Sequence, residues 1–146
     1  MPIIFDSTYP FEIGKAVTVR DGTDATIIAN RDLVVQSLVA AEHLVGRGIS
    51  VRVIDCHTLK PLDVETVLTA AEETGAVVTA ENNVFFGGLG SAVAEVLVEN
   101  NPIPMKRIGV RDTFAESGPY LQLLEKYGLS ANHIVKAVED VLKRKG

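Results

Sequence analysis

The chain has 146 residues and a formal net charge of −5, a length that fits one domain with a substantial buried core. Its basic residues are spread along the chain until the last few positions, so the sequence offers no basic face for a nucleic-acid backbone. No apolar run approaches the roughly 18 to 20 residues of a bilayer-spanning helix, and the first residues do not resemble a signal peptide. We therefore expect a cytoplasmic protein that binds neither nucleic acid nor a membrane.

Cysteine and histidine are too sparse to suggest a metal centre. Cys56 is the only cysteine, so an internal disulfide and a cysteine metal cluster are both excluded. The three histidines, His43, His57 and His133, lie far apart and form no ligand spacing such as HxxxH. We expect no metal site in this chain.

The N-terminal part differs from the rest of the chain. Residues 1–13 are expected to lead in from a preceding domain, although the whole chain, 1–146, is predicted to form a single domain. Alternation in "PFEIGKAVTVR" before the turn at Asp21-Gly22 predicts an edge strand, which could run antiparallel to the others.

The body of the chain alternates short β-branched runs with helical runs, the pattern of βα units around a mostly parallel sheet. Strands are predicted at 25–29, 50–55, 76–81 and 106–110. Helices are predicted at 32–48, 62–75, 89–100 and 130–146, with a short one at 120–128. Asp63 and Ser130 suit N-caps, and Gly75 suits a C-terminal stop. In the first of these helices, Val34, Leu38, Ala41 and Val45 are predicted to form the apolar face. One α/β/α layered domain follows.

Ligands of open α/β sheets bind beyond the carboxyl ends of the parallel strands. The residues predicted to follow the strands are polar as a group: Asn30, Arg31 and Asp32; Asp55, Cys56, His57 and Thr58; Glu81, Asn82 and Asn83; Arg111 and Asp112. This edge of the sheet is the place to look for a site.

A glycine-rich stretch, "ENNVFFGGLGSAVAEVL", spans 81–97 and leads into a helix. Gly87, Gly88 and Gly90, followed by Ser91, would let backbone N–H groups face an anion. The spacing is not GxGxxG, however, and the lysine of a P-loop is missing. A tight structural turn from strand to helix is the favoured interpretation.

The remaining acids and bases assemble no catalytic set. Asp55 and His57 could form an acid–base pair, but a polar cluster closing the strand is the stronger interpretation. Glu116 and Ser117 are typical of a helix entry before Pro119. No GxSxG nucleophile elbow is present.

Five motifs, in order, resemble the C-terminal domain of transketolases. They are "FEIGKAVTVRDGTDATIIA", "VRVIDCHTLKPLD", "AAEETGAVVTAENNVFFGGLGSAVAEVL", "MKRIGVRDTFAESG" and "LLEKYGLSANHIVKAV", and they cover nearly the whole chain. The match is most similar to the split type, in which two polypeptides encode the enzyme. Deoxyxylulose phosphate synthase and the beta subunits of 2-oxo acid dehydrogenases share this domain type.

The resemblance implies a three-layer α/β/α fold with a five-stranded mixed sheet and one antiparallel edge strand. It also implies a transferase that uses thiamine diphosphate and Mg²⁺ to move a two-carbon ketol unit between sugar phosphates. In that family the cofactor lies between a pyrophosphate-binding and a pyrimidine-binding domain, contributed by different subunits of a dimer. We therefore expect this chain to bind no cofactor, to carry no catalytic residue and to contribute to the assembly of a homodimer.

The chain departs from the family at several polar positions. Many relatives have Thr-Gly where this chain has Asn30-Arg31, Glu-Glu-His where it has Glu81-Asn82-Asn83, and Phe-Gly-Glu-Ser-Gly where it has residues 114–118, "FAESG". One set of residues therefore remains as a candidate anion or domain-interface site: His57, Glu81, Asn83, Gly87, Gly88, Gly90, Ser91, Glu116 and Ser117. A free-standing module that binds a small anion there is the alternative function.

Overall fold

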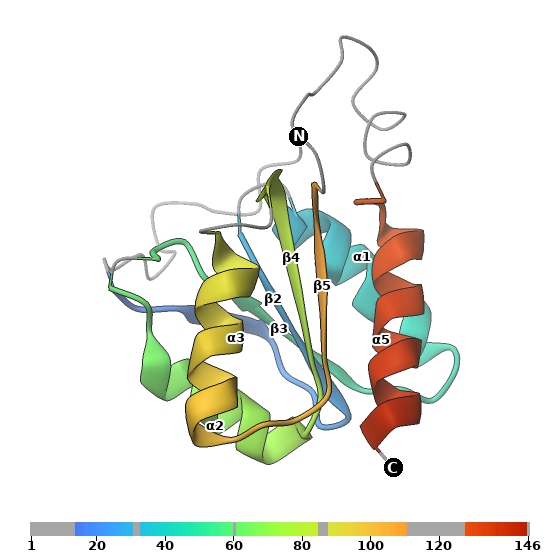
Figure 1. The fold of residues 1–146 in the computed structure, drawn as a ribbon. Helices are drawn as coiled ribbons and strands as arrows, with labels where there is room; N and C mark the ends of the chain where they lie inside the picture. The colour runs from blue at the N-terminus through green and yellow to red at the C-terminus, as the bar shows by residue number, and fades with distance from the viewer. Residues whose placement is uncertain (1–13, 31–32, 60, 85–87, 111–127, 146) are drawn as a thin grey trace, which may run out of the picture.

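A computed structural model describes residues 14–30, 33–59, 61–84, 88–110 and 128–145. The strands are β1 (Val17–Arg20), β2 (Ala25–Ala29), β3 (Val51–Asp55), β4 (Val77–Val84) and β5 (Met105–Val110). The helices are α1 (Leu33–Val45), α2 (Val64–Thr74), α3 (Leu89–Asn100) and α5 (Ala131–Lys145), with labels as in Figure 1.

The five strands form one mixed sheet in the order β1-β3-β2-β4-β5. β2, β3, β4 and β5 pair in parallel, and β1 pairs antiparallel with β3 at one edge. The five-stranded mixed sheet and its antiparallel edge strand are thus confirmed. The predicted strand at 25–29 matches β2 residue for residue.

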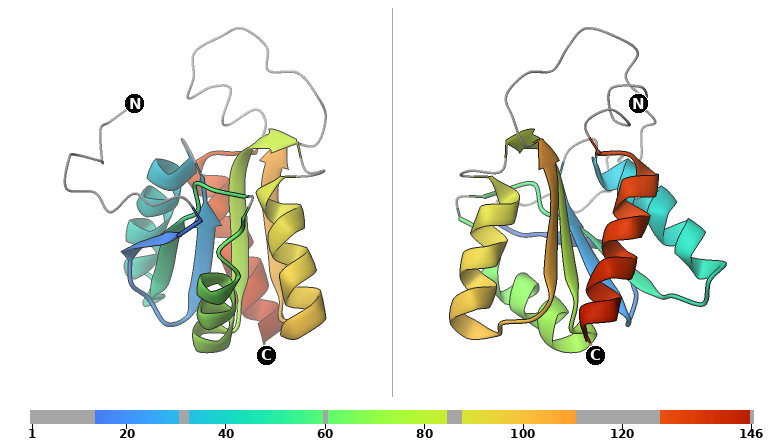
Figure 2. Two further views of the ribbon diagram at one scale, coloured as in Figure 1. Left: turned by 90° about the vertical axis from the view of Figure 1, so that its left-hand side faces the viewer. Right: turned by 45° about the vertical axis from the view of Figure 1, so that its right-hand side comes forward.

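Among the described elements, α1 and α5 cover one face of the sheet and α2 and α3 cover the other, which makes three layers (Figures 1 and 2). Successive side chains of a strand point to opposite faces, so the buried strands serve two cores. Ile27 and Val53 pack with α1 and α5, whereas Ile28 and Ile54 pack with α2 and α3. Strands buried on both faces read as nearly continuous apolar runs, as these do.

Local signals in the sequence account for three of the described helix ends. The side chain of Asp63 accepts a hydrogen bond from the backbone N–H of Thr66 at 3.1 Å, as an N-cap does. Gly75 ends α2 in the left-handed conformation with φ of 72°. Ser130 precedes α5, and its carbonyl accepts from the N–H of Ile134 at 3.1 Å.

Two predictions about these elements were wrong. The apolar face of α1 does not include Val45, which is 50 % exposed, because the helix buries Leu44 and Ser37 instead. Ser37 can be buried because its hydroxyl donates to the carbonyl of Leu33 at 2.6 Å. β4 also does not end at Glu81 but continues to Val84, where it pairs again with β5 after an irregularity in register. The predicted helix at 120–128 lies outside the described residues, apart from position 128.

Candidate functional site

The carboxyl ends of β2, β3 and β4 lie side by side and bury several polar groups. Asn30 is 6 % exposed, Asp55 is 4 % exposed and Glu81 is fully buried. The pairing of Ala29 with Asp55 and with Ala80 brings these residues to one edge of the sheet. The sequence correctly placed polar residues at these strand ends, but it ended the strand at Glu81, whereas Asn82 and Asn83 also belong to β4.

Glu81 is bonded to the start of α3. The backbone N–H of Leu89 donates to its Oε1 at 2.8 Å, and the N–H of Gly90 donates to its Oε2 at 2.6 Å. The first N–H groups of a helix have no partner within the helix, and the helix dipole makes that end favourable for a negative charge. The carboxylate of Glu81 therefore occupies the position that an anionic ligand of the glycine-rich stretch would take.

Glycine is needed at two positions for this contact. A Cβ atom on Gly88 would lie 2.2 Å from Oε1 of Glu81, closer than any two such atoms can approach. A Cβ on Gly90 would lie 2.9 Å from Cδ of Arg107 and 3.0 Å from Oγ1 of Thr79. These glycines let α3 approach β4 and β5, which is the structural role that the sequence favoured.

Burial and local charge act in opposite directions on Glu81. Burial raises its pKa above the usual value, and it outweighs the bonds from Gly90 and Leu89 and the positive charge of Arg107, which lower it. The carboxyl group is thus held in a place that penalises its ionised form.

Asn30 contributes a second buried polar group at this edge. Its backbone N–H donates to the carbonyl of Ala80 at 3.2 Å, and its own carbonyl accepts from Leu33 at the start of α1. Within the described part of the chain, its side-chain Oδ1 is buried and has no hydrogen-bond partner. A buried acceptor at this edge is the kind of feature expected where another domain or a ligand approaches.

The loop after β3 brings Cys56 and His57 to the same edge. Cys56 is 1 % exposed, and burial raises the pKa of its thiol to about 11. His57 is half-buried. Asp55 and His57 both lie at this strand end, where the sequence favoured a polar cluster over an acid–base pair.

Some of the remaining candidate site residues lie within the described part of the chain and others lie outside it. Ser91 is half-buried in the first turn of α3. Asn83 lies in β4, and its side chain is outside the described part, as are Gly87, Glu116 and Ser117, together with Arg31, Asp32, Arg111 and Asp112 from the loops. His133, on α5, is half-buried, with its Nδ1 2.8 Å from the hydroxyl of Ser130.

Neither a metal cluster nor a membrane-spanning helix is found in the described residues. No group of three or more His, Cys, Asp or Glu side chains there could hold a metal ion. No helix among them is long and apolar enough to cross a bilayer. The described residues therefore contain no cluster of three such side chains that could hold Mg²⁺ without other ligands.

A groove along β5, the edge strand opposite β1, was not predicted from the sequence. It is lined by cationic residues of β5 and α5, namely Lys106, Arg107 and Arg144. The only sequence signal was the run "MKRIGV", in which two adjacent charges occupy a predicted strand. Their approach to Arg144 depends on the packing of α5 beside β5.

Comparisons with known proteins agree with this fold. Residues 14–134 match the family model described as transketolase, C-terminal domain. The chain is 53 % identical over 135 residues to the 6-deoxy-6-sulfo-D-fructose transketolase subunit SqwH of Clostridium sp. (strain MSTE9), covering 92 % of this chain and 42 % of that protein. It is 43 % identical over 138 residues to 1-deoxy-D-xylulose-5-phosphate synthase of Syntrophotalea carbinolica (strain DSM 2380 / NBRC 103641 / GraBd1), covering 94 % of this chain and 22 % of that one.

A solved structure extends the agreement to three dimensions. The chain superimposes on a split gene transketolase, described as an inactive beta4 tetramer, with a TM-score of 0.94 and 47 % identity. The match covers 99 % of this chain and 48 % of that one. The chain thus spans less than half the length of the relatives it matches. Because the family model covers most of the sequence and the fold is the same, the chain belongs to the family of transketolase C-terminal domains.

Proposed function

We propose that this chain serves as the C-terminal domain of a split-type transketolase, an enzyme that moves a two-carbon ketol unit between sugar phosphates. The observation that carries the proposal is the continuous match over 14–134, together with similarity to a transketolase subunit and to a split gene transketolase. The five motifs in the sequence support the same enzyme.

The role proposed for this domain is assembly and not chemistry. Its most buried carboxylate, Glu81, is bonded to two backbone N–H groups of α3 and is fully buried. A catalytic acid or base must reach the proton that it transfers, and Glu81, in β4, lies against the start of α3. The buried acceptor of Asn30 suits contact with another domain better than catalysis.

Thiamine diphosphate and Mg²⁺ belong to this proposal through the other two domains of the enzyme. When bound, the thiazolium ring of this cofactor supplies the carbanion chemistry of ketol transfer. The proposed partners are the pyrophosphate-binding and pyrimidine-binding domains, in a homodimeric and cytoplasmic enzyme. The relative from Clostridium is named a subunit, which supports a multi-chain assembly.

A deoxyxylulose phosphate synthase is the second candidate, because one relative with that name is 43 % identical to the chain. The two are distinguished by assaying the complete enzyme with the substrates of each reaction, at equal concentrations of thiamine diphosphate and Mg²⁺. Ketol transfer between sugar phosphates at the higher kcat/KM supports the first candidate. A higher kcat/KM for deoxyxylulose phosphate synthesis overturns it.

The anion-binding module is the less supported alternative. An anion at the start of α3 would have to displace the carboxylate of Glu81 from Leu89 and Gly90. Titration of the ¹⁵N-labelled chain with phosphate, sugar phosphates and nucleotides tests this alternative. Saturable amide shifts at Gly88, Leu89 and Gly90 would support it.

A further inference from the structure

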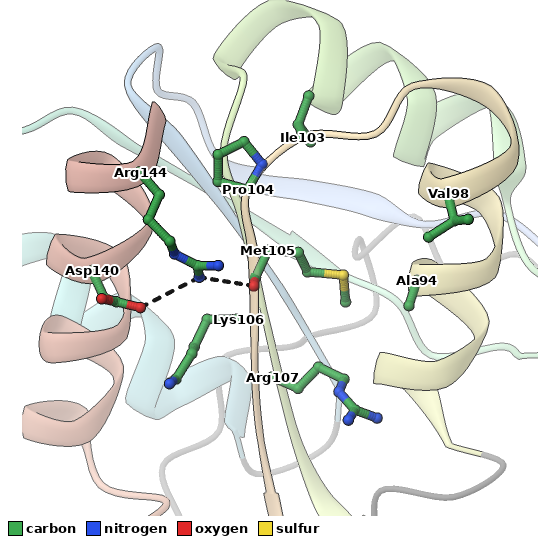
Figure 3. Close-up of a pocket in the computed structure, with 9 residues that line it drawn as sticks. All are labelled: Ala94, Val98, Ile103, Pro104, Met105, Lys106, Arg107, Asp140 and Arg144. Atoms are coloured by element: carbon green, nitrogen blue, oxygen red, sulfur yellow. Dashed lines mark hydrogen bonds and ion pairs between the residues drawn. The ribbon is translucent and has the colours of Figure 1, made fainter. Parts of the chain in front are cut away.

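β5 is the last strand of the sheet, and a groove of about 720 Å³ runs along it between α3 and α5 (Figure 3). Part of its lining is aliphatic. Ala94 and Val98 line it from α3, while Met105 lines it from β5. Val98 is 72 % exposed, more than any other large apolar side chain described as exposed. The groove therefore presents an apolar surface to solvent.

The rest of the lining carries an excess of positive charge. Among the described lining residues, Lys106, Arg107 and Arg144 are accompanied by one acid, Asp140, so their formal charge is +3 − 1 = +2. The whole chain has a charge of −5. Arg144 lies 3.3 Å from Asp140 and donates to the carbonyl of Met105 at 3.0 Å. The groove along β5 is thus positively charged, whereas the chain as a whole is negatively charged.

The two strand cations lie on opposite sides of this edge. Adjacent residues of a strand point to opposite faces of the sheet. Figure 3 shows Lys106 on the side of α5 and Arg107 on the side of α3. A compact anion could therefore contact one of them but not both. A ligand that runs along the strand can place acidic groups on both sides, since its own side chains also alternate.

We propose that the groove along β5 binds an extended segment of a second polypeptide that combines acidic with aliphatic side chains. The acidic groups contact Lys106 and Arg107, and the aliphatic ones cover Val98 and Met105. Sheet edges bind extended peptides in many recognition domains. Because Arg144 already holds the carbonyl of Met105, recognition at that end of the strand uses side chains and not a continuous backbone ladder.

The chemistry of the groove favours a peptide over a nucleic acid. Among the described residues that line it, none is aromatic, so none could stack on a base. Its three cations are few for a nucleic-acid backbone on a chain of charge −5. Like charges also oppose the pairing of two β5 strands from two copies of the chain.

The test uses a labelled synthetic peptide of about ten residues, the length of a long strand, with a central Asp-Glu pair between valines and leucines. A matched peptide has Asn-Gln at the centre. Fluorescence anisotropy gives both affinities, and ¹⁵N spectra of the chain locate the contact. We expect the acidic peptide to bind more tightly than the Asn-Gln peptide, with amide shifts at Val98, Lys106 and Arg107. Its affinity should fall as the NaCl concentration rises from about 0.05 to about 0.5 M.

Substitutions separate this groove from general attraction between charges. Lys106→Glu is expected to lower the affinity for the acidic peptide by about 3- to 10-fold. Lys136→Glu, an exposed change on α5 outside the groove, should have little effect on that affinity. The proposal is overturned by equal affinity for the two peptides, by equal effects of the two substitutions, or by an oligonucleotide that binds the groove as tightly. Concentration-dependent shifts in the groove without peptide would overturn it in favour of a second copy of the chain.

Discussion

The N–H of Gly90 donates to Oε2 of Glu81 at 2.6 Å, so a residue of β4 caps the helix that begins eight residues later. The same carboxylate binds the N–H of Leu89. The carboxylate thus joins β4 to α3, the helix that follows it in the chain. The N–H groups of Leu89 and Gly90, at the end of the glycine-rich stretch, thus have an acidic partner within the same chain.

Gly88→Ala is expected to destabilise the protein by about 1 to 3 kcal/mol, the usual cost of forcing an atom into a packed site. The added Cβ would lie 2.2 Å from Oε1 of Glu81, so the carboxylate or the helix start must move. Urea unfolding followed by circular dichroism measures the change in the free energy of unfolding. Gly46→Ala is the control, because its Cβ would meet only the carbonyl of His43 at 3.4 Å. Equal stability of the two variants would contradict the packing described here.

Glu81→Gln is expected to lower the free energy of unfolding by about 1 to 3 kcal/mol at neutral pH. The amide keeps one acceptor, so one of the N–H groups of Leu89 and Gly90 would face a donor. Glu95→Gln, an exposed change on α3, is the matched control and should lie within about 0.5 kcal/mol of the parent.

The pH dependence of that difference follows from the raised pKa of Glu81. Between the unfolded pKa near 4.5 and the higher folded pKa, the native state binds more protons than the unfolded state. The stability of the parent relative to Glu81→Gln should therefore fall as pH rises through this range. Carboxyl ¹³C shifts measured against pH give the folded pKa directly, and a value at or below 4.5 would contradict the account.

Asp63→Ala is expected to lower the free energy of unfolding by about 1 to 2 kcal/mol, because Asp63 caps α2 and also binds the residue that precedes β1. Its Oδ2 accepts from the N–H of Ala16 at 2.9 Å and from the hydroxyl of Thr66 at 2.7 Å. Thermal and urea unfolding measure the loss. Asp21→Ala is the control, since that side chain is 91 % exposed and lies 3.6 Å from Arg52. A larger effect at Asp21 would show that β1 is held differently.

Asp63 should show the opposite pH behaviour to Glu81. Burial raises its pKa, but the bonds from Thr66 and Ala16 outweigh that effect and hold it below the usual 3.8. The stability that it contributes is complete above pH 3.8 and is lost as pH falls through its folded pKa. In Asp63→Ala, this acid-sensitive part of the unfolding curve should disappear.

Cys56 should react slowly with thiol reagents in the native protein. It is 1 % exposed, and its pKa of about 11 leaves little thiolate at mildly alkaline pH. A chromogenic disulfide reagent at about pH 8 should label it roughly two orders of magnitude more slowly than in denaturant, where the pKa returns towards about 8.5. Because it is the only cysteine, the signal is unambiguous. Rapid, complete labelling of the folded chain would show that the loop after β3 opens.

The sequence predicted the layers of the fold because its signals are local. β2 and its neighbours are continuous apolar runs, and Asp63 and Gly75 mark the ends of α2 through their own backbone requirements. The partners of Glu81 were not predictable in this way. Nothing in "ENNV" shows that the strand continues past Glu81, because that continuation depends on pairing with β5. The error at Val45 has a similar origin, since α1 packs against α5, which comes from the other end of the chain.

Of the candidate site, the sequence predicted the edge of the sheet and the structural use of the glycines. It did not predict that Asn30 would be buried, nor that Lys106 and Arg107 would line a groove with Arg144. Both outcomes depend on contacts between residues far apart in the chain. The predicted roles of Gly87, Glu116 and Ser117 stay predictions.

The central claim is that this domain supports a transketolase without catalysing its reaction alone. The most direct measurement is ketol transfer with thiamine diphosphate and Mg²⁺, comparing the chain alone, the polypeptides bearing the pyrophosphate-binding and pyrimidine-binding domains alone, and the mixture. The account predicts no activity from the chain alone and an increase when it joins the others, on one polypeptide or as a separate one. Ketol transfer by the chain alone, or activity of the other domains that is unchanged when the chain is present, would contradict it.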